Sequence, residues 1–379
     1  MKILLVGTGG YAVNYVNSLL SCKDSDIIWE GIVDPYYSAC PKKAEIDELN
    51  IPVYNTMDEF YKDHSADLAV ISTPPYLHCE QSVCALSHGS NVLCEKPIAP
   101  TVAEGEKMLE AEEKYGKFIA IGYQWSFAKT ILELKKDILS GLFGKPISLK
   151  TSVSWPRNKA YYNRTTGWGG KISKNGVLVL DSIASNACAH YLHNMFFILG
   201  SDINTSASVT DVKADCFRAN DIENFDTCTI KMKDENDTDL YFIASHAADR
   251  KRDPEFIYEF ENAVITYSTD TAKRVVARFR DGNVKDYGDP FADGMKKLWD
   301  CVDAVRENAA PTCSVKTALT HTRVIEYLYK NVEITDFPLD IIHTDEKEDR
   351  IFVDGLFEKI YEAYEGTLLL SDVWDSLIV

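Results

Sequence analysis

The sequence opens on ILLVGTGGYA (residues 3–12), in which an apolar run leads into a turn that contains three glycines. The run predicts a buried strand, and the spacing Gly7-x-Gly9-x-x-Ala12 predicts a sharp turn into a helix. In such a turn the first glycine permits the bend, the second lets the backbone approach a pyrophosphate, and the small third residue lets the helix pack on the strand. The candidate cofactor-binding residues here are Gly7, Gly9, Gly10, Tyr11 and Ala12.

An acidic residue follows at the distance that this kind of turn requires. Asp34 lies 22 residues beyond Ala12, at the end of the second expected strand. In a dinucleotide site an acid about 20 residues after the turn accepts hydrogen bonds from a ribose and repels a 2′-phosphate. The next residues, Pro35-Tyr36-Tyr37, contain no arginine that could neutralise such a phosphate. The sequence therefore favours NAD over NADP.

Residues 1–127 alternate short apolar runs with amphipathic stretches, as do parallel strands joined by crossover helices. We predict an α/β protein whose first domain, residues 1–127, is a doubly wound parallel Rossmann sheet that binds the dinucleotide. The expected strands are Ile3–Val6, Ile27–Val33, Leu68–Ser72, Asn91–Cys94 and Phe118–Gly122, and the expected helices are Tyr11–Leu20, Met57–Lys62, His78–Ser87 and Val102–Tyr115.

The pattern of apolar and polar residues changes after the first domain. Residues 128–379 predict an α+β domain for substrate binding and oligomerisation. Segments rich in Val, Thr, Tyr and Phe, separated by turn residues, predict an open and mostly antiparallel sheet. Because an open sheet needs cover, we expect a homodimer or homotetramer. No low-complexity linker separates the halves, so we expect them to share a cleft. The expected strands are Ile147–Ser154, Ser206–Cys216, Asp226–Met232, Asp239–Ser245, Phe256–Glu261, Val264–Ser268 and Arg274–Phe279, and the expected helices are Asp181–Leu199, Phe291–Glu307 and Val315–Tyr329.

Composition excludes several classes of partner. The 379 residues carry a formal net charge of −18, which repels nucleic acid and anionic membranes. No run of apolar residues is long enough to span a bilayer. The ten cysteines form no Cys-x-x-Cys pair, and no cluster of metal ligands is visible. We expect a cytoplasmic protein that needs no metal.

The third expected strand ends in a stiff segment, Ser72-Thr73-Pro74, and His78 follows near the start of the next helix. Ligands of open parallel sheets lie at the carboxyl ends of the strands, so these residues are candidates for contact with the cofactor. The alternative is a rigid loop in which Thr73 caps the helix.

The fourth expected strand closes on Glu95-Lys96-Pro97, and here the sequence resembles a known family. The glycine turn, Thr-Pro-x-x-x-His and Glu-Lys-Pro, followed by Gly122-Tyr123-Gln124, are similar to the oxidoreductases named for glucose-fructose oxidoreductase, inositol dehydrogenase and the rhizopine-catabolism protein (Gfo/Idh/MocA). The resemblance implies that Lys96 contacts nicotinamide and substrate, and that Glu95 binds the nicotinamide ribose. We add Gln124 to the cofactor site and Tyr123 to the substrate site. A lysine beside a positive nicotinamide should lose its proton more easily and could assist proton transfer. The alternative is that Lys96 is an exposed loop charge.

The expected helix from residue 181 to 199 carries three polar residues that we place on one face. At about 100° per residue, Asn186, His190 and His193 fall close together. The resemblance aligns His190 with the family's catalytic histidine and places Asn186 and His193 where acids often stand. Because asparagine cannot stabilise an imidazolium by charge, Lys96 would then carry more of the proton transfer. Asp181 is expected to cap the helix, and either histidine could instead be a hydrogen-bonded core residue.

An aromatic and basic insert precedes this helix. It contains Trp155-Pro156-Arg157 and Tyr161-Tyr162-Asn163-Arg164 and ends in Trp168-Gly169-Gly170. Aromatic faces stack on sugar C–H surfaces, and Arg157 and Arg164 could bind hydroxyls or a carboxylate. The positive charge in an acidic protein predicts an anionic group on the substrate or, equally, a contact between subunits.

These features together predict an oxidoreductase that transfers hydride between NAD and a secondary alcohol of a sugar, polyol or cyclitol. Lys96 and His190 are the candidate catalytic residues. Two other functions are compatible with the same fold. One is an NAD-dependent glycosidase that oxidises, eliminates and re-reduces the sugar with its cofactor retained, and the other is a non-catalytic NAD sensor.

Overall fold

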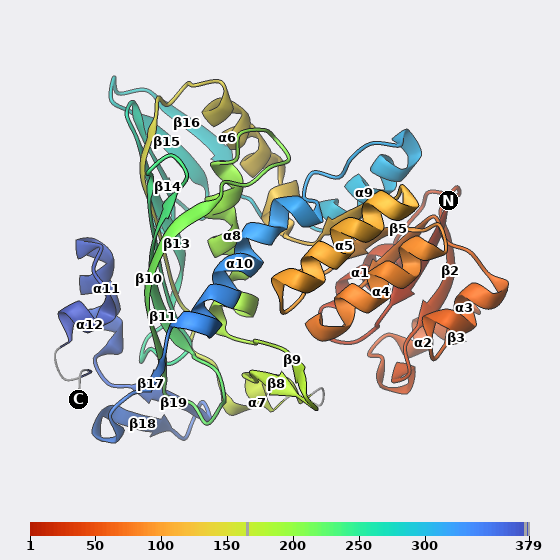
Figure 1. The fold of residues 1–379 in the computed structure, drawn as a ribbon, viewed down its shortest axis with the longest axis horizontal. Helices are drawn as coiled ribbons and strands as arrows, with labels where there is room; N and C mark the ends of the chain where they lie inside the picture. The colour runs from red at the N-terminus through yellow and green to blue at the C-terminus, as the bar shows by residue number, and fades with distance from the viewer. Residues whose placement is uncertain (164–166, 375–376, 378–379) are drawn as a thin grey trace. The chain divides into compact units, whose positions relative to one another are not determined.

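The computed structural model describes residues 1–163, 167–374 and 377. These residues form two compact units, coloured along the chain in Figure 1. Unit 1 comprises Met1–Ala128 and Asp293–Leu319, and unit 2 comprises Lys129–Ala292 and Thr320–Val379. Unit 1 thus takes in a second segment from late in the chain. The division into independent domains at residue 127 stays a prediction.

Unit 1 is built on a six-stranded parallel sheet in the order β3-β2-β1-β4-β5-β6, which confirms the predicted Rossmann topology. Its central strands are fully buried, with Leu4, Leu5 and Val70 at 0% exposure, because helices cover both faces of a parallel sheet. The strands are β1 (Lys2–Val6), β2 (Ile28–Val33), β3 (Val53–Tyr54), β4 (Leu68–Ile71), β5 (Asn91–Cys94) and β6 (Ile119–Ile121).

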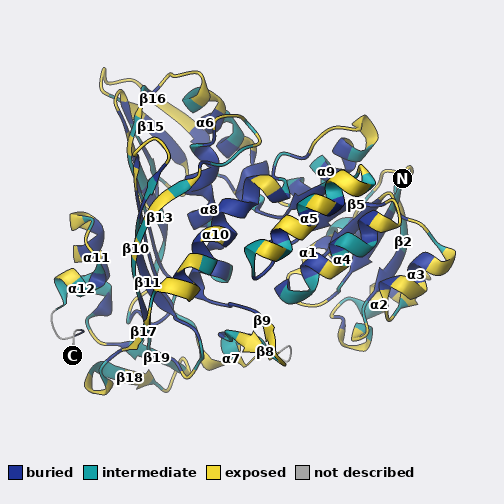
Figure 2. Ribbon diagram, in the orientation of Figure 1, coloured by how far each residue is buried: buried dark blue, intermediate teal, exposed yellow. Residues whose placement is uncertain are grey.

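The helices of unit 1 begin where the sequence supplies caps. Thr56 and Thr101 each form a capping box with the glutamate three residues later, at the starts of α3 and α5. Figure 2 shows α4 and α5 with buried inner faces and exposed outer faces. The helices are α1 (Ala12–Leu20), α2 (Lys43–Asp47), α3 (Met57–Asp63), α4 (Pro75–Ser87), α5 (Val102–Tyr115) and, from the late segment, α9 (Lys296–Glu307).

Unit 2 is built on a nine-stranded sheet in the order β16-β15-β14-β13-β7-β12-β11-β10-β17. Most neighbours are antiparallel, as predicted, but β7 pairs with β12 and β10 pairs with β17 in parallel, so the sheet is mixed. The strands are β7 (Pro146–Ser154), β10 (Val209–Arg218), β11 (Thr227–Asp234), β12 (Asp239–Ser245), β13 (Arg252–Phe260), β14 (Ala263–Tyr267), β15 (Val275–Phe279), β16 (Val284–Gly288) and β17 (Ile334–Asp336).

Helices lie on both faces of the large sheet. In Figure 1, α8 (Ala189–Ile198) and α10 (Val315–Asn331) lie on one side, and α11 (Leu356–Gly366) and α12 (Leu370–Val373) on the other. The sheet residues Tyr241 and Ile243 pack in one apolar cluster with Leu356, Ile360 and Leu370 of these last helices. The chain therefore covers part of the second face itself, and a homo-oligomer stays a prediction.

Shorter elements complete unit 2. They are α6 (Lys129–Leu139), α7 (Lys159–Tyr162), the hairpins β8 (Ser173–Lys174) with β9 (Val177–Leu178) and β18 (Ile342–Asp345) with β19 (Arg350–Val353), and a 3-10 turn at Leu339–Ile341. Unit 1 also contains 3-10 turns, at Tyr37–Ala39 and Gln124–Phe127. In the part of the chain that the structure describes, no helix is both long and apolar enough to cross a membrane.

Candidate active site

The turn between β1 and α1 is held against the end of β4. Gly7 has φ +90°, and a Cβ at this position would lie 2.5 Å from the carbonyl oxygen of Ser72, so only glycine fits. Its amide donates to the carbonyl of Val33 at 2.9 Å. Helix α1 then begins with no side-chain cap and no acidic residue in its first turn. The positive end of its dipole therefore meets no protein carboxylate from that turn, which suits an anionic phosphate.

The Asp34 carboxylate is fixed beside this turn. Its Oδ2 accepts hydrogen bonds from the amide of Thr8 at 2.8 Å and from the Thr8 hydroxyl at 2.6 Å. Its Oδ1 accepts from the amide of Tyr36 at 2.8 Å. Each oxygen of a carboxylate has about two acceptor positions, so Asp34 is pre-oriented and can still accept from a ribose hydroxyl. Thr8 was not among the predicted site residues, although its place inside the glycine turn is the signal that could have found it.

His78 connects the segments that follow β4 and β5. Its ring is fully buried, with Nδ1 2.8 Å from the carbonyl oxygen of Pro97 and Nε2 2.9 Å from that of Thr73. Burial lowers the pKa of the imidazole, although both carbonyls favour its protonated form. Thr73 does not cap α4: it donates to Oε1 of Gln81 at 2.6 Å, and Pro74 occupies the cap position. The structure thus places His78 as a link between two backbone segments of the candidate cofactor site.

Glu95 lies in a buried charge network at the carboxyl end of β5. Its Oε1 accepts from the Tyr15 hydroxyl at 2.6 Å and forms an ion pair with Lys297, whose side chain is 0% exposed. Lys297 also donates to the Gly122 carbonyl at 3.2 Å, and its ammonium lies 4.4 Å from the ring centre of Tyr11. Burial alone would lower the pKa of Lys297, but the attraction of Glu95 and Tyr11 outweighs burial and raises it. The network therefore holds a charged pair inside unit 1.

This network depends on residues that sequence reasoning missed. Lys297 lies 202 positions from Glu95 and comes from α9, so no local pattern joins them. Gly122 makes room for the carboxylate, because a Cβ there would lie 2.9 Å from Oε1 of Glu95. Tyr15 lies on α1, within the first predicted helix, but a buried tyrosine on an apolar face carries no signal of an acidic partner.

The remaining predicted residues of unit 1 lie on the same edge of its sheet. Lys96 is the one partly exposed residue in the otherwise buried stretch from 91 to 100, and its amide donates to Oε2 of Glu95 at 3.2 Å. Gln124 donates to the Gly294 carbonyl at 3.3 Å and accepts from the Tyr11 hydroxyl at 3.4 Å. Tyr123 is 0% exposed. The carboxyl ends of β1, β2, β4, β5 and β6 therefore carry the whole predicted cofactor site.

In unit 2 the helix predicted from residue 181 to 199 is broken, which corrects the prediction. A π-helical turn spans Ile183–Ala187, and α8 starts at Ala189. Ser182, not Asp181, is the cap, and it forms a capping box with Ser185. The predicted role of Asp181 as a cap is therefore wrong, because the Ser182 hydroxyl already accepts the bond that a cap makes.

Asp181 instead binds Asn186. Its Oδ1 accepts from the Asn186 side-chain amide at 2.8 Å, and its Oδ2 accepts from the Gly170 amide at 2.6 Å. A carboxylate thus lies next to the position where the family resemblance implied an acid. It orients the Asn186 amide, because only the nitrogen of that amide can donate.

The three polar residues of this region differ in exposure. Asn186 and His190 are partly exposed, whereas His193 is 1% exposed and stacks on Phe197 with ring centres 5.9 Å apart. Burial, followed by the nearby charges of His321 and Lys135, lowers the pKa of His193 well below its ordinary value. The π turn changes the number of residues per turn between residues 186 and 193, which a uniform helical periodicity cannot anticipate. Arg157 is partly exposed, and Arg164 lies outside the described residues.

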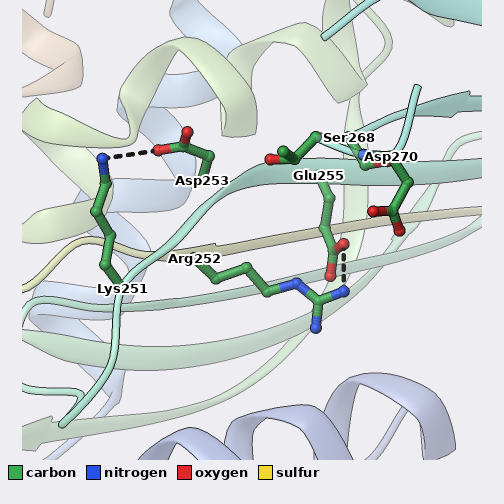
Figure 3. Close-up of a pocket in the computed structure, with 7 residues that line it drawn as sticks. Lys251, Arg252, Asp253, Glu255, Ser268 and Asp270 are labelled. Carbon is green, nitrogen blue, oxygen red and sulfur yellow. Dashed lines mark hydrogen bonds and ion pairs between the residues drawn. The ribbon is translucent and has the colours of Figure 1, made fainter. Parts of the chain in front are cut away.

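A separate charged pocket of about 260 Å³ lies along β13 and the segment after β14 (Figure 3). Four of its charged side chains are paired with one another: Lys251 with Asp253 at 3.1 Å and Arg252 with Glu255 at 2.7 Å. Internal pairing leaves little unbalanced charge for a ligand. Among the described residues, no group of His, Cys, Asp and Glu side chains is arranged to hold a metal.

Comparison with known proteins agrees with the geometry. The strand order and glycine turn define a dinucleotide-binding domain of the Rossmann class, and residues 1–123 match the family profile described as "Oxidoreductase family, NAD-binding Rossmann fold". This N-terminal domain belongs to the Gfo/Idh/MocA oxidoreductase family.

Two curated relatives illustrate the similarity. Inositol 2-dehydrogenase of Salmonella typhimurium is 34% identical over 108 residues, which cover 28% of this chain and 32% of that protein. The 2,7-anhydro-N-acetylneuraminate hydratase of Mediterraneibacter gnavus is 25% identical over 189 residues, 50% of this chain and 48% of that protein. The chain thus spans less than half the length of these curated relatives.

One solved structure extends the likeness to the whole fold. The WlbA dehydrogenase of Chromobacterium violaceum, in complex with NADH and UDP-GlcNAcA, superposes with a TM-score of 0.71 at 20% identity. The match covers 87% of this chain and 93% of that one, so both units share its fold.

Proposed function

We propose that the chain is an NAD-dependent oxidoreductase that transfers hydride between a secondary alcohol of a sugar, polyol or cyclitol and the nicotinamide. The observation that carries this proposal is the Asp34 carboxylate, held by Thr8 beside a turn that only glycine can form. These residues fit a dinucleotide: the turn admits a phosphate, and the fixed carboxylate accepts ribose hydroxyls. Relatives named as inositol and sugar dehydrogenases support the substrate class.

The chemistry divides between cofactor and chain. Hydride acceptance is what the nicotinamide ring supplies when NAD is bound. Oxidation of the alcohol to a ketone also releases a proton from the hydroxyl, and a side chain must take it. We assign this proton to Lys96 or His190, the two partly exposed basic residues at the predicted positions. Glu95 is assigned to the nicotinamide ribose, with its Oε1 held by Tyr15 and Lys297.

Cofactor preference gives the first test. NADH should bind about 10- to 100-fold more tightly than NADPH, because a 2′-phosphate would meet the fixed Asp34 carboxylate. Asp34→Ala should weaken the binding of NADH and reduce the ratio of the NADPH and NADH dissociation constants. Asp63→Ala, which removes an exposed acid of α3, should leave this ratio unchanged. Fluorescence titration of each protein with both nucleotides measures the effect. Tighter binding of NADPH by the native protein would contradict the assignment of Asp34.

The reaction class is tested by incubating the NAD-bound protein with a panel of sugars, polyols and cyclitols. Net formation of NADH with the matching ketone is the expected result. The relative named as a hydratase favours one second candidate, in which the sugar is oxidised, eliminated and re-reduced with the cofactor retained. Product formation without net NADH would establish that candidate. Tight NAD binding with no turnover of any compound would instead point to a sensor.

A further inference from the structure

The guanidinium of Arg157 lies over two aromatic rings at the exit of β7. Its guanidinium carbon is 4.7 Å from the ring centre of Tyr161 and 5.5 Å from that of Trp155. Its amide donates to the His246 carbonyl at 3.1 Å, and Nδ1 of His246 lies 2.8 Å from the carbonyl oxygen of Trp155. These contacts continue the pairing of β7 with β12 beyond the strand ends. They hold both the Trp155 carbonyl and the Arg157 amide, so the backbone that carries Arg157 is fixed.

Among residues 1–163, 167–374 and 377, the charge of Arg157 has no acidic partner. Several arginines of unit 2 pair with acids, among them Arg218 with Asp336 at 2.7 Å and Arg252 with Glu255, as Figure 3 shows. Arg157 forms no ion pair with any acidic residue that the structure describes, and its Nε is buried without a hydrogen-bond partner. A buried N–H donor without a partner is unfavourable, so this position favours a hydrogen-bond acceptor, and the positive charge of the side chain favours an anion.

Stacking sets which anion fits. A guanidinium that lies over aromatic rings can still present its parallel N–H groups, which match a planar group with two oxygens. A carboxylate has this geometry. The aromatic rings beside it suit the C–H faces of a sugar.

The position of Arg157 also relates it to the candidate substrate helix. The Trp155 ring contacts the Tyr191 ring in an edge-to-face arrangement with centres 5.6 Å apart. Tyr191 follows His190 directly in α8. An anion at Arg157 would therefore lie close to α8, the helix that carries His190.

We propose that Arg157 binds the carboxylate of an acidic sugar, and that such sugars are the substrates of this chain. This inference rests on the proposed function for the oxidation itself, but the binding can be measured alone.

The experiment is calorimetric titration with matched pairs that differ in a carboxylate: D-glucuronate and D-glucose, D-galacturonate and D-galactose, D-gluconate and D-glucitol. Each pair is measured with and without NADH. At least one acid should bind about 10- to 100-fold more tightly than its neutral partner, the range expected for a charged hydrogen-bonded pair. Arg157→Met should abolish this preference, and Arg157→Lys, which keeps the charge without the fork, should retain part of it.

The controls separate the alternatives. Arg278→Met removes an exposed arginine of β15 and should leave every affinity unchanged. The proposal is overturned if no acid binds better than its partner, or if Arg157→Met keeps the preference. It is also overturned if Arg157→Met changes only the oligomeric mass of the protein in solution, since Arg157 would then serve a contact between subunits. Preferential binding of acids without NADH formation would leave this site in place and refute the proposed oxidation.

Discussion

Replacing Lys297 by methionine should destabilise unit 1 by about 3–5 kcal/mol, the range measured when one partner of a buried ion pair is removed. Lys297 is 0% exposed, so its loss would leave Glu95 buried beside Tyr15 without a counter-charge. Methionine fills a similar volume, which keeps the cavity contribution small. Hydrogen exchange at the amides of β1 and β5 measures the effect within unit 1, because the two units need not unfold together.

Two further variants make this expectation specific. Lys296→Met removes the neighbouring lysine of α9, whose pair with Asp300 is about one-third exposed, and should cost only about 0–1 kcal/mol. Glu95→Gln combined with Lys297→Met should recover part of the loss, because neither charge then remains buried alone. Equal stability of Lys297→Met and Lys296→Met would show that the buried pair contributes nothing.

The pH dependence of this pair follows from the raised pKa of Lys297. A group whose pKa is raised by folding stabilises the folded state below its unfolded pKa and loses that contribution as pH rises through the folded value. The stabilisation by Lys297 should therefore be constant through neutral pH and be lost only in strongly alkaline solution.

The fold of unit 1 could be predicted from the sequence because the patterns that mark its strands and turns are local. The predicted strand at residues 91–94 matches β5, and the expected strand from residue 3 differs from β1 by one residue. Buried parallel strands are continuous apolar runs, and the glycine turn marks where the first one ends. The predicted cofactor residues lie together at one edge for the same reason, since they follow successive strands of one sheet.

What the sequence could not supply depends on distant partners. Lys297 has no local signature, and its burial is visible only once α9 packs against β5. The local sequence of the π turn at residues 183–187 does not distinguish it from an α-helix. Only its hydrogen-bond pattern identifies it as a π turn. Helices α6 and α11 were not predicted, although α11 covers apolar residues of the large sheet. That α11 covers part of the open sheet face depends on tertiary packing, which no local sequence pattern shows.

Replacing Lys96 by methionine should lower kcat/KM by about 10²- to 10⁴-fold, the usual contribution of a side chain that transfers a proton, while NADH still binds. Lys96 is partly exposed within a buried stretch, so methionine can occupy the position without unfolding the segment. Lys114→Met, at the exposed end of α5, is the matched control and should change kcat/KM by less than about 2-fold. Steady-state kinetics on the substrate found by the panel measures both. A Lys96→Met enzyme as active as the control would reduce Lys96 to a loop charge.

Comparison with His190→Ala then identifies which residue takes the proton. Asn186 offers His190 no charge, and its side-chain amide donates to Asp181. If both residues serve one proton transfer, the double variant should be no slower than about the slower single variant, because residues that act as a unit are not additive. If Lys96 transfers the proton and His190 only orients the substrate, the effects should multiply. In the oxidation direction, the fall of kcat/KM at low pH, where the base is protonated, should then be lost in Lys96→Met alone.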